Sequence, residues 1–273
     1  MQYLNSVPLA WGITDGVQRD QFDAVLSTPA ECAQQLAQGK VDVGLIPSIE
    51  FQRIPGTTIV PGAAVASRHR VKSVLLVSEV PLWRVRTVAH DKGSKTSVTL
   101  AQIIFREFYR TKPEFRPADP DPANMLATSD AALIIGDVAL KFMETNNLPE
   151  IENQRPLVRH GAEPLQIFDL MERWQFLTGK PFVFAFWAVR SGFKGKGVVE
   201  SINSSRDEGV QNIPAIAERY ASHLNMSKDF LQQYLEKNVY YYLDRDCLEG
   251  LQLFYEKAAQ IGAIKSARKV EFL

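Results

Sequence analysis

The sequence has no excess of charge of either sign. Lys and Arg together number 31 and Asp and Glu also number 31, in a chain of 273 residues. Without a net field, nothing in the composition favours binding to nucleic acid or to an anionic membrane, so we expect neither as a partner. Any anionic ligand must therefore be held by local hydrogen-bond donors.

Cysteine is scarce, and long apolar runs are missing. Cys32 and Cys247 match neither C-x-x-C nor a zinc-binding spacing, and they are too few for a disulfide scaffold. We therefore expect two buried thiols in a reducing compartment. The chain also lacks a basic stretch followed by an apolar stretch near Met1, and it has no apolar run of roughly 18 residues. These absences predict a cytoplasmic protein.

The common catalytic motifs are missing too. The sequence contains no G-x-G-x-x-G, no G-x-x-x-x-G-K-[ST], no H-E-x-x-H and no G-x-S-x-G. This argues against nucleotide binding, zinc hydrolysis and serine-hydrolase chemistry. The histidines show no metal-ligand spacing; they are His69, His90, His160 and His223. We expect no metal and no cofactor.

What is present is an alternation of helical and strand patterns. Thr28-Pro29-Ala30-Glu31 is a capping box with proline at the first helical position, which predicts a helix ending near Gly39. The apolar run from Val41 to Ile46 then suits a strand of a parallel sheet. Further strands are predicted at 71–78, 87–91, 131–137 and 182–189, and successive helices after residue 189, at 203–212, 214–224, 227–236 and 248–261. The pattern predicts an α/β protein with two lobes and a ligand site between them.

Small polar residues stand where predicted strands end or helices begin. In "YLNSVPL" a strand-like run stops at Asn5 and Ser6, which either cap a helix or face a ligand. Thr96 and Ser97 precede an amphipathic helix, where they are N-caps or, about equally well, hold a carboxylate at the positive helix end. Three more residues have either a structural role or a place in the ligand site. The structural role would be a loop cap for Ser48, a core hydroxyl for Ser73 and a turn or helix cap for Asp137.

Taken together, several stretches resemble one known family. They are "YLNSVPL", "GKVDVGLIPSIEF", "SRHRVKSVLLVS", "GSKTSV", "ALIIGD", "TGKPFVFAFWAVR" and "LEGLQLFYEKAAQIGAI". In this order and at these separations they resemble the MqnA family, the chorismate dehydratases of the futalosine route to menaquinone. The resemblance covers essentially the whole chain. It implies the two-lobe fold of type 2 periplasmic solute-binding proteins, with one lobe from residues 1–83 and 188–273 and the other from 84–187.

The resemblance also implies a reaction and a set of site residues. Chorismate would lose water to give 3-[(1-carboxyvinyl)oxy]benzoate, a carbon–oxygen lyase reaction without a cofactor. Asn5 and Ser73 match family positions near the reacting ring and are assigned catalytic roles. Neither is a good base at neutral pH, so the substrate's own enolpyruvyl carboxylate is the expected proton acceptor. The residues expected to bind the substrate are Ser6, Ser48, Ser67, Thr96, Ser97 and Asp137. We expect a monomer or a weak homodimer.

The sequence departs from the family pattern in its first segment and at His69, and the change at His69 bears on the substrate pose. Family members usually have several more residues before Tyr3, which complete a first strand, and a glycine where His69 stands. Two rival functions remain open: a non-catalytic binding protein for a small carboxylate, and the related 1,4-dihydroxy-6-naphthoate synthase.

Overall fold

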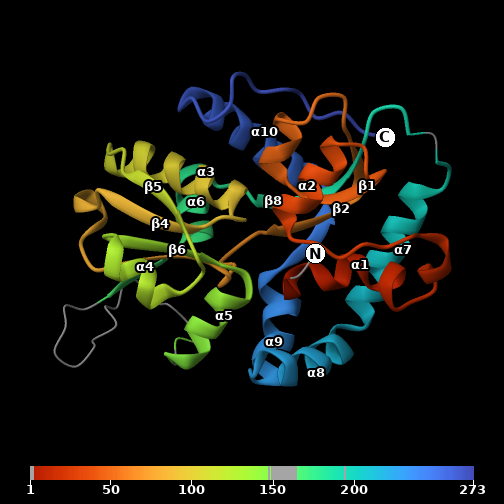
Figure 1. Ribbon diagram of the computed structural model, residues 1–273, viewed down its shortest axis with the longest axis horizontal. Coiled ribbons are helices and arrows are strands. Elements are labelled where there is room, and N and C mark those ends of the chain that lie inside the picture. The colour runs from red at the N-terminus through yellow and green to blue at the C-terminus, as the bar shows by residue number, and fades with distance from the viewer. Residues whose placement is uncertain (1–2, 147, 149–164, 194) are drawn as a thin grey trace.

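The chain forms two β-sheets flanked by helices (Figure 1). The computed structural model describes residues 3–146, 148, 165–193 and 195–273. The strand order is β1-β8-β2-β9 in the first sheet and β5-β4-β6-β3-β7 in the second. The strands are β1 (Val43–Pro47), β2 (Thr58–Ser67), β3 (Val74–Ser78), β4 (Thr87–Asp91), β5 (Glu114–Ala118), β6 (Ala131–Ile135), β7 (Gln166–Asp169), β8 (Phe182–Val189) and β9 (Tyr240–Leu243). The helices are α1 (Val7–Thr14), α2 (Pro29–Ala37), α3 (Lys95–Ile104), α4 (Pro122–Thr128), α5 (Gly136–Thr145), α6 (Leu170–Thr178), α7 (Val198–Gln211), α8 (Ile213–Leu224), α9 (Lys228–Gln233) and α10 (Arg245–Gln260).

Local sequence signals explain several of these elements. The capping box at the start of α2 is formed, since the Thr28 hydroxyl accepts from the Glu31 amide and the Glu31 carboxylate accepts from the Thr28 amide. The helix ends at Ala37 and Gly39 follows with a φ of +68°, as the sequence predicts. The strand predicted at 182–189 is also confirmed, since Gly179 ends α6 in the left-handed conformation and β8 follows at Phe182.

The first sheet differs from the prediction in strand direction. The apolar run at β1 was expected in a parallel sheet, but β1 pairs antiparallel with β8, which also pairs antiparallel with β2. The expectation was wrong because a short apolar run reveals burial on both faces and not the direction of its neighbour. Strands β2 and β9, which complete this sheet, had no counterpart in the predicted elements.

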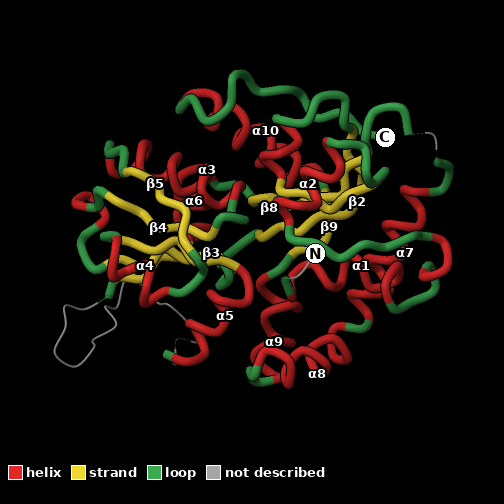
Figure 2. Tube along the Cα trace, viewed as in Figure 1, coloured by secondary structure: helices red, strands yellow, loops and turns green. Residues whose placement is uncertain are grey.

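The second sheet is mixed. Strand β4 runs parallel to β5 and to β6, and each connection passes through a helix, α3 or α4, as parallel strands require. Strand β3 lies antiparallel to β6 and β7. Figure 2 shows helices around both groups of strands. This arrangement places the start of α3 and the start of α5 at one end of the sheet, directly after β4 and β6.

The N-terminal segment is helical where a strand was expected to end. Leu4–Ser6 form a 3-10 turn, and α1 follows with Pro8 in its first turn. Proline fits there because the first N–H groups of a helix make no hydrogen bond within the helix. Ser6 takes the N-cap position but makes no side-chain capping bond. The rest of the expected first strand, residues 1 and 2, lies outside the described residues.

The chain changes sheets twice. It leaves the first sheet at Ser67 and enters the second at Val74, and it leaves the second at Asp169 and re-enters the first at Phe182. The lobe boundaries expected at residues 84 and 188 stay a prediction. The strand pairing favours boundaries several residues earlier at both crossings.

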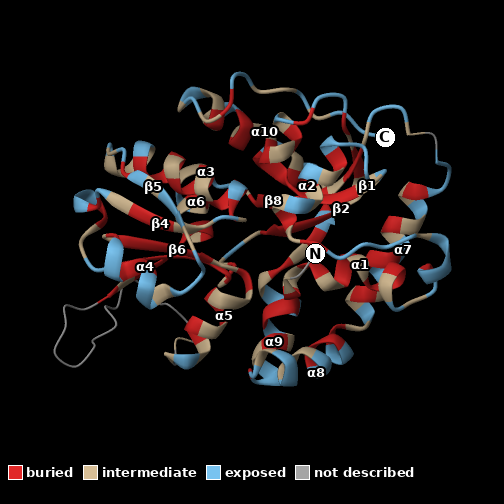
Figure 3. Ribbon diagram, viewed as in Figure 1, coloured by how far each residue is buried: buried red, intermediate tan, exposed pale blue. Residues whose placement is uncertain are grey.

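Buried residues form a shared core on one side of the two sheets (Figure 3). One cluster joins β8, α3, α6 and α10, and within it the rings of Phe182 and Phe254 meet edge to face with centroids 4.9 Å apart. Trp174 packs edge to face on Phe182 at 5.3 Å. Helix α10 therefore ties the two sheets together on this side.

Candidate functional site

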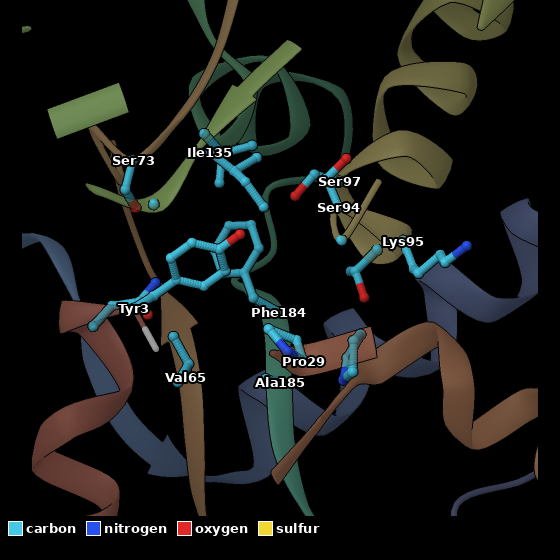
Figure 4. A pocket seen from close by; sticks show the side chains of 16 residues that line it. Tyr3, Pro29, Val65, Ser73, Ser94, Lys95, Ser97, Ile135, Phe184 and Ala185 are labelled. Carbon is cyan, nitrogen blue, oxygen red and sulfur yellow. The ribbon is translucent and has the colours of Figure 1, made fainter. Parts of the chain in front are cut away.

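A cleft lies between the two sheets, where the N-terminal segment, the first crossing segment and the start of α3 meet. It encloses about 520 Å³ of space, including the part open to solvent. Ser73 faces it from the crossing segment and Ser94 and Ser97 from the start of α3, with the rings of Tyr3 and Phe184 between them (Figure 4). Four of the predicted site residues line this cleft; they are Asn5, Ser73, Thr96 and Ser97.

One wall of the cleft is built on a buried hydrogen bond. The Tyr234 hydroxyl donates to Ser73 Oγ at 2.8 Å, and the Asn5 side chain lies close to the same tyrosine. The Ser73 carbonyl accepts from the Gly136 amide at 2.8 Å. We call Asn5, Ser73 and Tyr234 the buried wall. Because Ser73 is held through both its carbonyl and its hydroxyl, its side chain is fixed in one orientation.

The opposite wall, which we call the open wall, is the start of α3 at Ser94–Ser97. Ser94 takes the N-cap position, but its hydroxyl donates to the Asp91 carbonyl and caps no helix N–H. Ser97 is 5% exposed, and its hydroxyl has no hydrogen-bond partner within the described residues. The first N–H groups of a helix have no acceptor inside the helix. This wall therefore presents donors and a positive helix end to an anion.

Lys95 is the one charged residue among those that line the cleft, and its side chain is exposed at the open wall. The lining contains no His, Asp, Glu or Cys. The cleft therefore combines a cation and hydrogen-bond donors, but no protein group of ordinary basicity faces it.

Tyr3 joins the two lobes across the cleft. Its hydroxyl donates to Asp91 at 3.1 Å, and its ring lies over Gly136, where a Cβ would come within 2.5 Å of the ring. Gly136 also has a φ of +58°, which side chains disfavour. Burial, with the nearby charge of Asp91, raises the pKa of Tyr3. Glycine at 136 is required on both counts, since it allows the turn from β6 into α5 and leaves room for the ring.

Asp137 lies behind this contact and does not line the cleft. Its carboxylate accepts from the Leu4 amide at 3.1 Å, so it holds the N-terminal segment against α5. Burial raises the pKa of Asp137 to about 6, and the Leu4 hydrogen bond offsets part of that shift. The structure thus gives Asp137 a structural contact between the lobes.

Three predicted site hydroxyls point elsewhere in this structure. Ser6 Oγ donates to the Tyr3 carbonyl at 2.7 Å, and Ser67 Oγ donates to the His69 carbonyl at 2.8 Å. Ser48 is fully buried and donates to the Val183 carbonyl at 2.8 Å. None of the three lines the cleft.

Thr96 is at the cleft, but its hydroxyl serves the lobe contact. Thr96 Oγ1 accepts from the Ile49 amide at 3.3 Å and lies 3.5 Å from Ser48 Oγ. This leaves Ser97 as the hydroxyl of the open wall that is free to meet a ligand.

Sequence reasoning missed several residues of the cleft. Tyr3 stands inside the "YLN" motif and Gly136 directly after an apolar strand, so both had a local signal. Tyr234 had none, because it lies 161 residues from its partner Ser73. Phe184, which lies within the strand predicted at 182–189, also lines the cleft.

A larger cavity lies along the outer edge of β1, away from these residues. It encloses about 1590 Å³ including open solvent, and residues 21–27 and 40–45 line its two sides. Among the described residues no strand pairs with this edge of β1, and the indole N–H of Trp187 is buried there without an acceptor. The smaller cleft is the better candidate site, because only it gathers polar side chains from both lobes.

No group of three or more His, Cys, Asp or Glu side chains is placed to bind a metal ion in the described part of the chain. Within the same residues, every helix is too short or too polar to cross a membrane.

Solved structures with the same arrangement define the class of protein. The AF1704 protein of Archaeoglobus fulgidus matches with a TM-score of 0.68 at 14% identity, over 96% of each chain. The periplasmic aliphatic sulphonate binding protein SsuA of Escherichia coli matches with a TM-score of 0.61 at 13% identity, over 98% of this chain and 87% of its own. At these identities the likeness shows the fold alone, which is that of the periplasmic binding proteins, as the expected fold class predicted.

Within that class, the chain belongs to the family described as "Menaquinone biosynthesis", whose family model matches residues 1–260. A chorismate dehydratase of Thermus thermophilus is 29% identical over 257 residues, which cover 93% of this chain and 92% of the relative. The resemblance found in the sequence motifs is thereby confirmed at the level of the family.

Proposed function

We propose that this protein is a chorismate dehydratase, a carbon–oxygen lyase acting in menaquinone biosynthesis. The observation that supports it best is the cleft itself, in which the Asn5 amide and the fixed Ser73 hydroxyl face the start of α3, whose free N–H groups suit an anion. The curated relative of Thermus thermophilus bears this activity in its name. A dianionic substrate needs such a pairing of donors, because the protein has no bulk positive charge.

The reaction is a balanced loss of water. The C3–H bond of chorismate breaks, and its electron pair becomes the new C3–C4 double bond of an aromatic ring. The C4–O bond breaks, and the departing hydroxide takes up a proton to leave as water. Aromatisation supplies driving force, so the protein has to hold one pose and stabilise the leaving oxygen.

The open wall would bind the ring carboxylate. The free hydroxyl of Ser97, the first N–H groups of α3 and the positive charge of Lys95 all suit a carboxylate. Of the hydroxyls assigned to substrate binding by resemblance, Ser97 is the one whose geometry supports that role most directly.

The buried wall would act on the reacting ring. Ser73 donates a hydrogen bond to the leaving C4 oxygen and keeps its proton. The Asn5 amide orients the enolpyruvyl carboxylate, which accepts the C3 proton and passes it to the departing hydroxide, so that water leaves. The lining offers no His, Asp, Glu or Cys to take that proton, which supports a base supplied by the substrate. Asn5 and Ser73 are therefore the proposed catalytic residues.

The test is to incubate the purified protein with chorismate. Loss of the substrate's diene absorbance should accompany a product lighter by one water, measured by mass spectrometry. Asn5→Ala and Ser73→Ala should each abolish most of this turnover. Near-normal turnover in both variants would contradict the catalytic assignment.

The rival functions give different outcomes in the same assay. Chorismate binding without product, measured by calorimetry, would instead support a carboxylate-binding protein. Absence of binding together with activity on a cyclic futalosine derivative would support the related naphthoate synthase.

A further inference from the structure

Tyr234 is a fully buried tyrosine directly behind the cleft. It follows α9 and begins a π-helical turn, Tyr234–Asn238, an irregularity frequent at functional sites. The residue is 1% exposed and does not line the cleft, so it cannot touch a substrate there. Its hydroxyl nevertheless reaches Ser73 Oγ at 2.8 Å.

The Tyr234 hydroxyl makes one directed hydrogen bond. Its phenol proton goes to Ser73 Oγ at 2.8 Å, and the Asn5 side chain lies close to the same phenol. Burial above all raises the pKa of Tyr234, so the phenol keeps its proton at neutral pH. A hydroxyl has one proton and two lone pairs. Because Ser73 accepts from Tyr234, its own proton is left for a partner in the cleft.

The neighbouring Tyr241 provides a contrast. It is also buried, at 3% exposed, and packs in the same apolar cluster as Tyr234. Its hydroxyl has no hydrogen-bond partner within the described residues. The two tyrosines thus differ in whether their hydroxyl is connected to the cleft.

We propose that Tyr234 is a positioning residue, which orients the Ser73 hydroxyl so that its proton points at the leaving oxygen of the substrate. The inference rests on the proposed dehydratase function. A fixed donor stabilises developing charge better than a rotating one, because no reorganisation is needed during the reaction. Donation by the tyrosine also polarises the serine hydroxyl and strengthens it as a donor.

The experiment compares Tyr234→Phe with Tyr241→Phe, each of which removes one buried hydroxyl. We expect Tyr234→Phe to lower kcat for chorismate about 10-fold with KM unchanged, a fraction of the loss expected when a direct donor is removed. Tyr241→Phe should keep kcat within about 2-fold, since its hydroxyl has no partner to lose. Thermal unfolding of both variants checks that they are folded.

A double variant separates positioning from structure. In a Ser73→Ala background, Tyr234→Phe should lower kcat no further, since the two residues act as one unit. Site-specific 3-fluorotyrosine at position 234, which keeps the hydroxyl, should restore kcat to within about 3-fold of wild type. This second variant keeps the test decisive if the phenylalanine variant folds poorly.

The two ways of failing are distinguishable. If the wild-type chain forms no product from chorismate, the proposed function fails and this inference fails with it. If the wild type is active and Tyr234→Phe matches it, or lowers kcat equally in the Ser73→Ala background, the inference alone is overturned.

Discussion

The two walls of the cleft use their polar groups in opposite ways. On the buried wall the Ser73 hydroxyl is paired inside the protein, since it accepts a hydrogen bond from Tyr234, and Asn5 lies close to the same tyrosine. On the open wall the Ser97 hydroxyl is unpaired among the described residues, and the exposed Lys95 stands beside it. Internal bonds fix a group in place, whereas unpaired donors are available to a ligand. Under the proposed function, we therefore assign the chemical step to the buried wall and substrate binding to the open wall.

Breaking the Tyr3 contact between the lobes should have the largest effect, and Gly136→Ala does so. Its left-handed backbone costs about 1 to 2 kcal/mol with a side chain, and the clash of a Cβ with the Tyr3 ring adds about 1 to 3 kcal/mol. We expect the free energy of unfolding to fall by about 4 kcal/mol, measured by urea denaturation. Gly192→Ala is the matched control, because its φ is +76° but a Cβ would have nothing within 4 Å. Equal losses in both variants would show that the Tyr3 contact is unimportant.

Asn5→Ala removes one polar side chain of the buried wall and leaves the open wall unchanged. We expect kcat for chorismate to fall about 100-fold with little change in KM, the usual result of removing a donor that acts in the transition state. Steady-state kinetics on the diene absorbance measure both constants. Ser67→Ala is the control, since its hydroxyl donates to the His69 carbonyl away from the cleft. A loss in Ser67→Ala as large as in Asn5→Ala would revive Ser67 as a site residue.

Asp137→Asn makes the contact between the lobes independent of pH. In the folded protein burial raises the Asp137 pKa to about 6 from an ordinary 3.8, so its ionisation disfavours the folded state. This penalty is absent below about pH 3.8, grows as the pH rises to about 6, and then stays at about 2 to 3 kcal/mol. The asparagine variant should therefore be more stable than wild type by that amount at pH 8, and equal at pH 3.5. Urea denaturation at both pH values measures this difference, and a constant difference would contradict the assignment.

Lys95→Gln tests whether the open wall acts in substrate binding, and it should have the smallest effect of these substitutions. Removing an exposed charge near a bound carboxylate typically costs about 1 kcal/mol, so we expect KM to rise about 5-fold with kcat unchanged. Lys92→Gln is the control, because Lys92 pairs with Asp119 outside the cleft. A fall in kcat with constant KM would assign the open wall to the chemical step and erase the distinction between the walls.

The sequence predicted best those elements whose signals are local. The capping box of α2 and the apolar run of β8 each lie within a few neighbouring residues, and the structure confirms both. Strands β2 and β9 were missed, and the direction of β1 was wrong. Pairing depends on a partner strand far away in the sequence, which no local pattern specifies.

The site residues divide in the same way. Four of eight predicted side chains line the cleft. Ser48 shows why others do not, since its hydroxyl is taken by the Val183 carbonyl, 135 residues away. Each hydroxyl was recognisable as a candidate, but whether it was free for a ligand depended on contacts made only after folding.

By itself, the sequence determined the family, the α/β class and the absence of bulk charge, because motifs and composition do not depend on packing. It also marked Asn5 and Ser73 as candidates. The tertiary structure decided which polar groups remained open to the cleft, and it brought Tyr234 against Ser73 across 161 residues of chain. A hydrogen bond forms only where two groups meet within about 3 Å, and folding alone brings such distant groups together.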